Sequence, residues 1–313
     1  MATHEFEPTR FHGTFGRHAP VLTVADGDTI RTWTVDAAGR NADGHALADG
    51  ANPLTGPFHV DGAEPGDRLR VRILEVTPNR SYGFGRASLA RNVVDPEAVA
   101  DLEHEPANDG AAWHVDPVAG TATLTRPHGP LAGLTLPWAP MLGCLGVAPA
   151  DGEAVSSATS GRHGGNMDVR RLGPGAVATF PVFVPGAALF FGDAHALQGD
   201  GEISGTGIEI SADVRVTVEV QKGRPPIVWP RGEDAEGRFT MGNARPLDQA
   251  TQHATTEMLR WLREETGLGP AEAGLFLSQT ARYEIGNVFD PAYTMVCRVP
   301  HDAWALLPRG GTA

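Results

Sequence analysis

Lysine and cysteine are almost missing from this chain of 313 residues. Lys222 is its single lysine, so mechanisms that need an activating lysine or a Schiff base have almost no residue to use. The two cysteines, Cys144 and Cys297, follow no metal-binding or redox spacing, and their apolar neighbours predict reduced, buried thiols. No apolar run is long enough for a membrane-spanning helix.

An excess of basic charge is missing as well, because 25 Lys and Arg residues stand against 38 Asp and Glu residues and the formal net charge is -13. Without a basic excess the chain cannot neutralise phosphate groups, which argues against nucleic acid or an anionic membrane surface as a partner. The segment from Met1 to Pro8 contains neither the basic nor the apolar part of a secretory signal. We therefore expect a soluble, cytoplasmic protein with no nucleic-acid or membrane partner.

Glycine and proline are abundant, with 39 and 25 copies, and this composition is typical of folds with many turns and short strands. We predict a mainly β protein with an α+β C-terminal part. The expected architecture is a jelly-roll-like β-sandwich with a smaller β-barrel-like region. Three parts are predicted: a β-sandwich domain over residues 1–130, a β domain with the main site motifs over 131–224, and an α+β region over 225–313.

Alternating apolar residues predict the strands. Two runs between Pro20 and Val35, on either side of Asp26-Gly27-Asp28, predict a hairpin. Residues 177–184 and 187–191 predict two strands joined by a Pro-Gly turn, and residues 208–220 predict one longer strand with a candidate bulge near Ala212.

Helical spacing of apolar residues predicts a helix from Leu247 to Gly267, which the glycine can end. Pro270 can begin a second helix that reaches about Ala281. Residues 285–299 predict a pair of strands around Asp290-Pro291.

Two further segments are candidates for contact with a ligand. Residues 36–57 show no period and predict a long loop, which is more often functional than incidental, and His45 and Asn52 lie on it. The Gly-rich segment Tyr82–Gly85 is equally consistent with a loop over a ligand and with a plain turn.

Polar side chains that could bind a ligand are densest between Gly161 and Glu202. They are interleaved with glycine, and they are His163, Asn166, Asp168, Asp193, His195, Gln198, Asp200 and Glu202. Such residues often cap turns in Gly-rich loops. Turns alone, however, require neither a histidine nor several acids beside it, so the combination favours a binding or catalytic site.

Spacing within this stretch arranges several of the side chains in pairs. Residues i and i+2 of a strand project to one face, so Asp193 and His195 suit a zinc site or a general acid–base pair. Asn166 with Asp168, and Asp200 with Glu202, share that spacing.

Serine catalysis is disfavoured. The stretch with Ser156, Ser157 and Ser160 faintly resembles a Gly/Ser-rich amidase loop, but no lysine is there to activate a serine. A Gly-x-Ser-x-Gly motif, a phosphate-binding loop and a dinucleotide-binding fingerprint are also missing.

Several long motifs together resemble the acetamidase/formamidase family, and they cover most of residues 20–220 in the family's order. The motifs are Pro20-Val-Leu-Thr-Val with Gly27-Asp28, Gly62-Ala-Glu-Pro-Gly-Asp67, Pro140-Met-Leu-Gly-Cys-Leu-Gly-Val-Ala-Pro149, Gly164-Gly-Asn-Met-Asp168, Pro181-Val-Phe-Val-Pro-Gly186 and Gly192-Asp-Ala-His-Ala-Leu-Gln-Gly-Asp-Gly-Glu202. The resemblance implies hydrolysis of a short linear amide to a carboxylate and ammonia, often with a bound divalent metal. It also implies a β-sandwich-containing fold.

The motifs of this family imply a site formed by Asn166, Asp168, Asp193, His195 and Glu202, with Glu64 as a further acid. The division of roles is our hypothesis from residue type and spacing. We assign metal binding to Asp168, Asp193 and His195, catalysis to Glu202, Glu64 and His163, and substrate binding to Asn166, Gly164, Gly165 and Gln198. The expected metal is Zn²⁺, with Ca²⁺ as an alternative.

In the expected mechanism the metal activates water, Glu202 or Glu64 carries the proton to nitrogen, and the Gly164-Gly165 amides stabilise the oxyanion. Two positions depart from the family pattern that we expect. His163 stands where members vary, and Arg282 stands where relatives are acidic. If the loop around Arg282 reaches the site, the substrate would differ from formamide and acetamide.

Two other functions stay open. The same site could open a γ-lactam ring, or the chain could be a non-enzymatic β module that binds a small polar ligand or Ca²⁺. The expected partners are a small amide substrate and further copies of the chain in a homo-oligomer.

Overall fold

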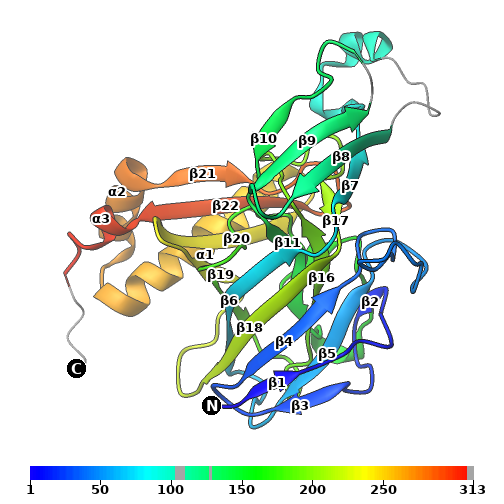
Figure 1. The fold of residues 1–313 in the computed structure, drawn as a ribbon. Helices are drawn as coiled ribbons and strands as arrows, with labels where there is room; N and C mark the ends of the chain where they lie inside the picture. The colour runs from blue at the N-terminus through cyan, green and yellow to red at the C-terminus, as the bar shows by residue number, and fades with distance from the viewer. Residues whose placement is uncertain (103–109, 127–128, 309–313) are drawn as a thin grey trace.

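The computed structural model describes residues 1–102, 110–126 and 129–308 (Figure 1). In these residues, strands form two large sheets and one two-stranded sheet. The α-helices all come from the C-terminal part and are α1 (Leu247–Thr266), α2 (Pro270–Thr280) and α3 (His301–Trp304). Short 3₁₀ turns are η1 (Arg91–Val93), η2 (Pro96–Asp101) and η3 (Ala150–Gly152).

One sheet joins the first described strand of the chain to the last. Its nine strands, in order, are β1 (Thr3–Glu5), β4 (Thr29–Thr34), β18 (Ala212–Gln221), β6 (Arg68–Pro78), β15 (Val177–Pro181), β19 (Arg231–Glu233), β20 (Gly237–Ala244), β22 (Tyr293–Pro300) and β21 (Arg282–Ile285). Strands from all three predicted parts pair in it, and the division into three domains stays a prediction.

The other large sheet contains the candidate site. Its strands, in order, are β10 (Thr135–Pro137), β9 (Thr121–Arg126), β8 (Gly110–Asp116), β7 (Tyr82–Arg86), β17 (Glu209–Ile210), β16 (Leu189–His195), β11 (Met141–Val147), β14 (Gly164–Asn166) and β13 (Ser160–Gly161). In addition, β5 (Leu54–Val60) pairs with β16, and β3 (Leu22–Val24) pairs with β5. The small sheet consists of β2 (Thr14–Phe15) and β12 (Val155–Ser156).

Apolar side chains fill the space between the two large sheets. Val71 of β6 and Val216 of β18 come from one sheet, and Leu145 of β11 and Phe191 of β16 come from the other. All four are fully buried, so the sheets pack face to face as in a β-sandwich. The predicted mainly β fold with a helical C-terminal part is confirmed, while the jelly-roll type stays a prediction.

The prediction of a barrel-like region is wrong, because neither large sheet closes on itself within the described residues. The two strands predicted on either side of the Pro-Gly turn do not pair with each other. β15 joins one sheet, and β16, the next strand along the chain, joins the other.

At two further places, consecutive strands of the chain belong to different sheets. The predicted hairpin between Pro20 and Val35 is wrong, since β3 and β4 lie in different sheets on either side of the turn at Gly27. The single strand predicted over residues 208–220 divides at Ser211 into β17 and β18, again in different sheets. Alternation identifies a strand but not its partner, and sandwich strands commonly cross between sheets.

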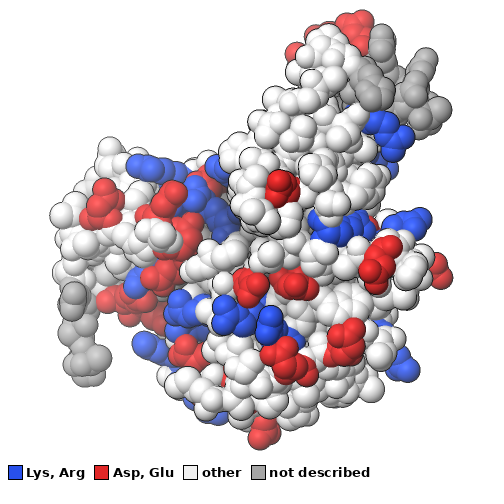
Figure 2. All heavy atoms as spheres, in the orientation of Figure 1, with Lys and Arg blue, Asp and Glu red and all other residues white. Residues whose placement is uncertain are grey.

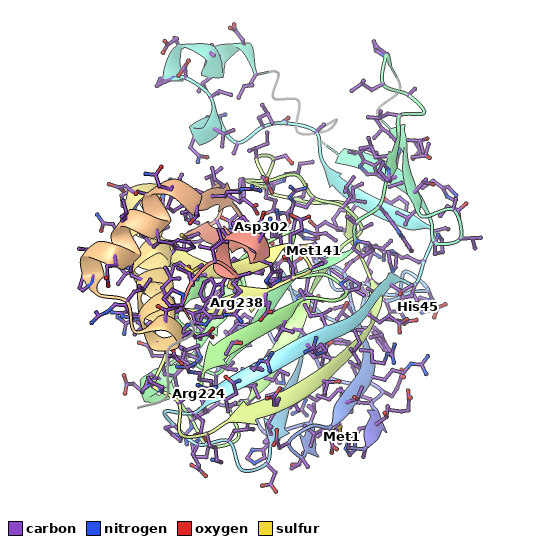
Figure 3. The ribbon with its side chains drawn as sticks, turned by 90° about the vertical axis from the view of Figure 1, so that its left-hand side faces the viewer. Met1, His45, Met141, Arg224, Arg238 and Asp302 are labelled. Carbon is purple, nitrogen blue, oxygen red and sulfur yellow. The ribbon has the colours of Figure 1, made fainter. Side chains whose placement is uncertain are left out.

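The two predicted C-terminal helices are confirmed. Gly267 follows α1 with a φ of 72°, a left-handed conformation that suits glycine, and its N–H donates to the carbonyl of Arg263. Met258 and Leu262 of α1 pack against Met295 of β22, so the helices lie beside this end of the nine-stranded sheet (Figures 1 and 3).

The outer face of the nine-stranded sheet carries charges of both signs. Basic and acidic side chains alternate over the face shown in Figure 2. Cross-strand pairs such as Arg70 with Glu219 and Arg215 with Glu75 contribute to this pattern. Among the described helices, none combines the length and apolar character needed to cross a bilayer.

Gly242 of β20 offers a test of how α1 packs on the sheet. A Cβ at this position would overlap the backbone of Ala250 and Ala254. We expect Gly242→Ala to lower the free energy of unfolding by about 1–3 kcal/mol, measured by chemical denaturation. Gly274→Ala, in α2 where a Cβ meets open space, should instead raise it by about 0.5–1 kcal/mol. An equal change in unfolding free energy for Gly242→Ala and Gly274→Ala would contradict the close packing of α1 on β20.

Candidate functional site

β16 changes its neighbour at the position of Asp193. Leu189 to Gly192 pair with β5, whereas Ala194 and His195 pair with β17. At the change Asp193 has a φ of 54°, in the left-handed region that non-glycine residues seldom adopt. The resulting break in the sheet opens toward a cavity, and Asp193 lines it.

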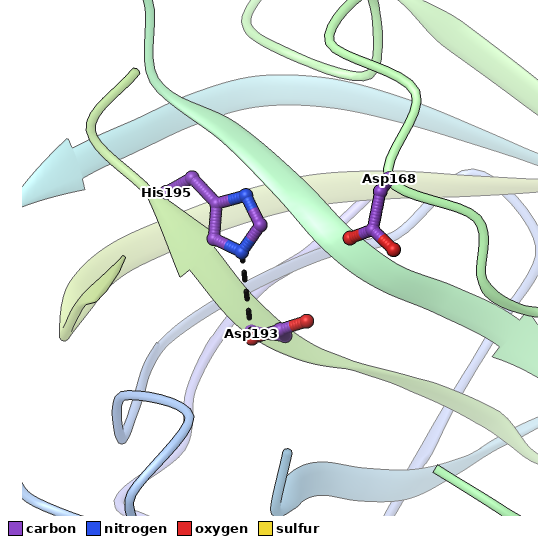
Figure 4. Close-up of side chains that lie close together, drawn as sticks. All are labelled: Asp168, Asp193 and His195. Carbon is purple, nitrogen blue, oxygen red and sulfur yellow. Dashed lines mark ion pairs between the residues drawn. The ribbon is translucent and has the colours of Figure 1, made fainter. Parts of the chain in front are cut away.

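Five carboxylates and one imidazole converge at this break. In each of three sets the candidate ligand atoms lie within 4.8 Å of one another, and the sets are Asp168, Asp193 and His195; His195, Glu202 and Glu209; and Asp168, Glu202 and Asp290. Figure 4 shows the first set, in which Nε2 of His195 lies 3.5 Å from Oδ1 of Asp193.

The backbone around the cluster is held in uncommon conformations. Asp168 and Glu202 have φ values of 49° and 44°, so both share the left-handed conformation of Asp193. A Cβ on Gly143 of β11 would lie 2.6 Å from Oδ1 of Asp168 and 2.8 Å from Oδ2 of Asp193. Glycine therefore leaves the space in which these two carboxylates meet. Strain of this kind is typical of functional sites.

Gln198 fixes the orientation and the tautomer of His195. Its Nε2 donates to the carbonyls of Asp168, at 2.6 Å, and Gly286, at 3.3 Å. Its Oε1 therefore accepts from Nδ1 of His195, at 2.8 Å. In a neutral imidazole this leaves Nε2, which faces Asp193 and Glu209, without a proton. Such an arrangement is characteristic of metal-binding histidines.

Burial raises the pKa of several carboxyls in the cluster. The pKa values of Asp168 and Glu202 lie well above those of ordinary carboxyls, and neighbouring acids add to the effect of burial. For the same first reason, the pKa of Glu209 is raised to about 7 and that of Asp290 to about 6. The cluster would therefore retain protons near neutral pH unless a cation compensated its charge.

Burial acts on the pKa of the His195 imidazole in the opposite sense. Burial lowers its pKa, but the carboxylates of Glu209 and Asp193 outweigh burial, and its pKa is raised well above the usual value. Nε2 of His195, Oδ1 of Asp168 and Oε2 of Glu209 are buried without a hydrogen-bond partner among the described residues. Buried atoms that can bind a metal but have no hydrogen-bond partner, together with the excess negative charge, fit a divalent cation.

A second layer of polar groups holds the cluster in place. Sγ of Cys144 donates to Oδ1 of Asn166 at 2.9 Å, and Nδ2 of Asn166 donates to Oδ2 of Asp290 at 2.6 Å. Nδ2 of Asn287 donates to Oδ2 of Asp168 at 3.2 Å. The prediction of reduced, buried cysteines is confirmed for both, but Cys144 adjoins the site. Burial raises the pKa of its thiol, and the charge of Asp193 raises it further.

The cavity beside the cluster has a volume of about 490 Å³. Four residues of the predicted long loop line it: Ala37, Ala38, Ala51 and Asn52. His45, on the same loop, is exposed. The segment from Tyr82 is strand β7, of which Phe84, Gly85 and Arg86 reach the cavity wall. Both candidate segments thus contribute to the cavity.

The structure brings together Asp168, Asp193, His195 and Glu202 from the sequence prediction, but not Glu64. Glu64 is exposed on a turn, where its N–H donates to Asp67, and it does not line the cavity. Asp200 is also directed away, toward Arg170 on the surface. The predicted pairing of Asp200 with Glu202 on one face is therefore wrong, because the chain turns between them at Gly201.

His163 and the two glycines after it lie outside the cavity lining. Burial lowers the pKa of His163 to about 4, and its ring lies 5.2 Å from that of Phe15. Gly164 and Gly165, at φ values of 90° and 106°, are needed because a Cβ would strike neighbouring strands. Their predicted catalytic and oxyanion roles remain untested predictions.

Two members of the cluster were not predicted. Glu209 pairs with His195 across β16 and β17, and the sequence placed it only within a predicted strand. Asp290 lies in the segment between β21 and β22, where Asp-Pro indicated only a turn. β17 lies between β16 and β7, and the alternation of residues along one strand does not reveal which strands will lie beside it. Arg282 is exposed on β21 and does not line the cavity, although Phe289 and Asp290 do.

The segments that form the cluster lie largely within a region that matches a known protein family. A model of the acetamidase/formamidase family matches residues 9–154 and 150–228. The chain belongs to the acetamidase/formamidase family. The matched residues include Asp168, Asp193, His195, Glu202 and Glu209, whereas Asp290 lies beyond them.

Curated members of the family match part of the chain. A formamidase of Methylophilus methylotrophus is 28% identical over 250 residues, which cover 64% of this chain and 61% of that protein. An acetamidase of Mycolicibacterium smegmatis is 29% identical over 260 residues, covering 64% and 63%. The matches thus span less than two thirds of these relatives.

Solved structures match nearly the whole chain. An acetamidase from Yersinia enterocolitica has a TM-score of 0.81 and 32% identity, covering 96% of this chain and 92% of that one. An acetamidase from Bacillus halodurans has a TM-score of 0.82 and 28% identity, covering 97% and 99%. A γ-lactamase from Delftia acidovorans, at a TM-score of 0.58 and 18% identity, shares the fold alone.

Metal binding at the cluster can be tested without an activity assay. Titration of metal-free protein with Zn²⁺, and in parallel with Ca²⁺, should raise the unfolding midpoint with at least one ion, because binding to the folded state stabilises it. Asp168→Asn should remove most of this rise. Asp200→Asn, the matched change at an exposed acid of the same stretch, should retain it. An undiminished rise in Asp168→Asn would show that the ion binds elsewhere.

Proposed function

We propose that the protein hydrolyses the C–N bond of a linear amide to a carboxylate and ammonia. The observation that supports this most directly is the convergence of Asp168, Asp193, His195 and Glu202 beside a cavity, in a chain that belongs to the acetamidase/formamidase family. Location in the cytoplasm and assembly into a homo-oligomer stay predictions.

An amide resists hydrolysis because its carbonyl carbon is weakly electrophilic and its nitrogen is a poor leaving group. A site for this reaction needs a polarised carbonyl, a nucleophilic water and a proton for the nitrogen. In this proposal Asp168, Asp193 and His195 hold a divalent cation, with Zn²⁺ as the expected ion. When bound, the cation would supply Lewis-acid polarisation and a water of lowered pKa.

Side chains of the protein orient His195 and supply the proton that the leaving nitrogen needs. Gln198 keeps Nε2 of His195 directed at Asp193 and Glu209. Glu202 lines the cavity, and burial raises its pKa, so it can hold a proton near neutral pH and deliver it to the leaving nitrogen. Asn166 holds Asp290 in position through a hydrogen bond.

Ammonia release from formamide, acetamide and propionamide tests the proposal directly. His195→Ala and Glu209→Gln should reduce kcat/KM by at least about a hundredfold, because each removes a buried member of the cluster. Glu64→Gln, a matched change at an exposed acid, should leave it within about twofold. Ring opening of a γ-lactam without hydrolysis of any linear amide would favour the cyclic alternative, and ion binding with no hydrolysis would favour a binding module.

Gln198 is expected to act by positioning. Gln198→Leu keeps the approximate size but removes the acceptor for Nδ1 of His195, so kcat should fall by about 10–100-fold while KM changes little. Affinity for the bound ion should fall with it. Gln221→Leu, the same change at the end of β18, is the control. A normal kcat in Gln198→Leu would contradict the positioning role.

A further inference from the structure

The cavity beside the acidic cluster has one basic residue in its described lining, Arg86. Its backbone N–H donates to Oγ1 of Thr206 at 2.7 Å, which anchors the end of β7 at the cavity wall. The side chain is exposed, and its guanidinium carbon lies 5.6 Å from the centroid of the Phe289 ring. Arg86 therefore lies where the cavity meets solvent, with its charge over an aromatic ring.

Phe289 is itself firmly placed beside the cluster. Its ring lies directly against Gly205, since a Cβ there would come within 2.6 Å of three ring atoms. The N–H of Gly205 donates to the carbonyl of Glu202 at 2.8 Å, and Phe289 immediately precedes Asp290. The Arg86–Phe289 pair is thus connected on both sides to acids of the site.

In the part of the chain that the structure describes, the contact recorded for the Arg86 guanidinium is the one with the Phe289 ring. Among the described residues no carboxylate forms an ion pair with Arg86. By contrast, Arg80 pairs with Asp36, and Arg171 pairs with Glu284. An arginine presents a planar fork that binds a carboxylate through two parallel hydrogen bonds, so an unpaired one on a cavity wall is suited to an anionic ligand group.

The size and lining of the cavity indicate a substrate longer than formamide. Its volume of about 490 Å³ lies within the range of about 300–1,000 Å³ typical of sites for larger small molecules. Phe84, Phe289, Ala37 and Ala38 supply apolar wall that an alkyl chain can cover. Formamide would touch little of this surface.

We propose that the preferred substrate is an amide with a carboxylate at its far end, the monoamide of a short dicarboxylic acid, and that Arg86 binds that carboxylate. The inference rests on the proposed amidase function. Water adds its oxygen to the amide carbon, the C–N bond breaks, and the nitrogen takes a proton and leaves as ammonia. The product is then a dicarboxylate, and no other reactant is needed.

The test compares succinamate with butyramide, which has the same carbon number but lacks the charge. In the wild-type protein kcat/KM should be higher for succinamate, and Arg86→Gln should reduce the ratio of the two values by about 10–100-fold. Arg86→Lys should retain part of the preference. Raising the ionic strength should weaken the preference in the wild type but not in Arg86→Gln. Arg224→Gln, at an exposed arginine that lines a different cavity, is the matched control.

Three results would overturn the inference while leaving the amidase proposal intact: no preference for succinamate in the wild type, an equal loss on both amides in Arg86→Gln, or an equal change of the ratio in Arg224→Gln. If neither these two amides nor formamide, acetamide or propionamide is hydrolysed, the amidase proposal fails, and calorimetry with succinamate and butyramide decides the inference. Tighter binding of succinamate that Arg86→Gln removes would then support it. Equal binding, or none, would overturn it.

Discussion

Repulsion between buried carboxylates is the constraint on which the site depends. Asp168, Asp193 and Glu202 approach one another in a place with little water, where like charges repel strongly. They remain there because all three have left-handed backbone conformations and because Gly143 leaves room for two of them. Burial and neighbouring acids raise the pKa values of Asp168 and Glu202, and the concentration of carboxylates fits a divalent cation. The site is therefore an arrangement that the rest of the fold must hold under strain.

The β-sandwich provides that support. Side chains such as Leu145 and Phe191 anchor β11 and β16 in a fully buried core, so these strands cannot shift to relieve the repulsion. At Asp193, β16 leaves one neighbour for another, and the site occupies that break. Loops that are distant in sequence then close around it, one carrying Asn52 and another carrying Asp290. Rigid strands thus hold the charged groups, and loops form the walls that a substrate would meet.

How much of the site could be predicted depended on how local each relation was. Asp193 and His195 were found because both lie on one strand, two residues apart. The helix from Leu247 was found because its apolar spacing repeats over about four turns and the segment ends in glycine. Glu209 and Asp290 were missed, because their roles arise from contacts with distant segments. Glu64 was named from its motif, and the structure places its turn at the surface, away from the cavity, so its catalytic role stays a prediction.

The sequence by itself determined the family, the mainly β character, the C-terminal helices and the dense polar stretch that contains His195. These properties are carried by residue types and short spacings, which a linear chain displays. Tertiary structure alone decided which sheet each strand joins, that Asp200 turns to solvent and Glu209 inward, and that Arg86 lies on the cavity wall. The physical reason is that pairing and burial are relations between segments far apart in the chain, and hydrogen-bond geometry and packing select them only when the whole fold forms.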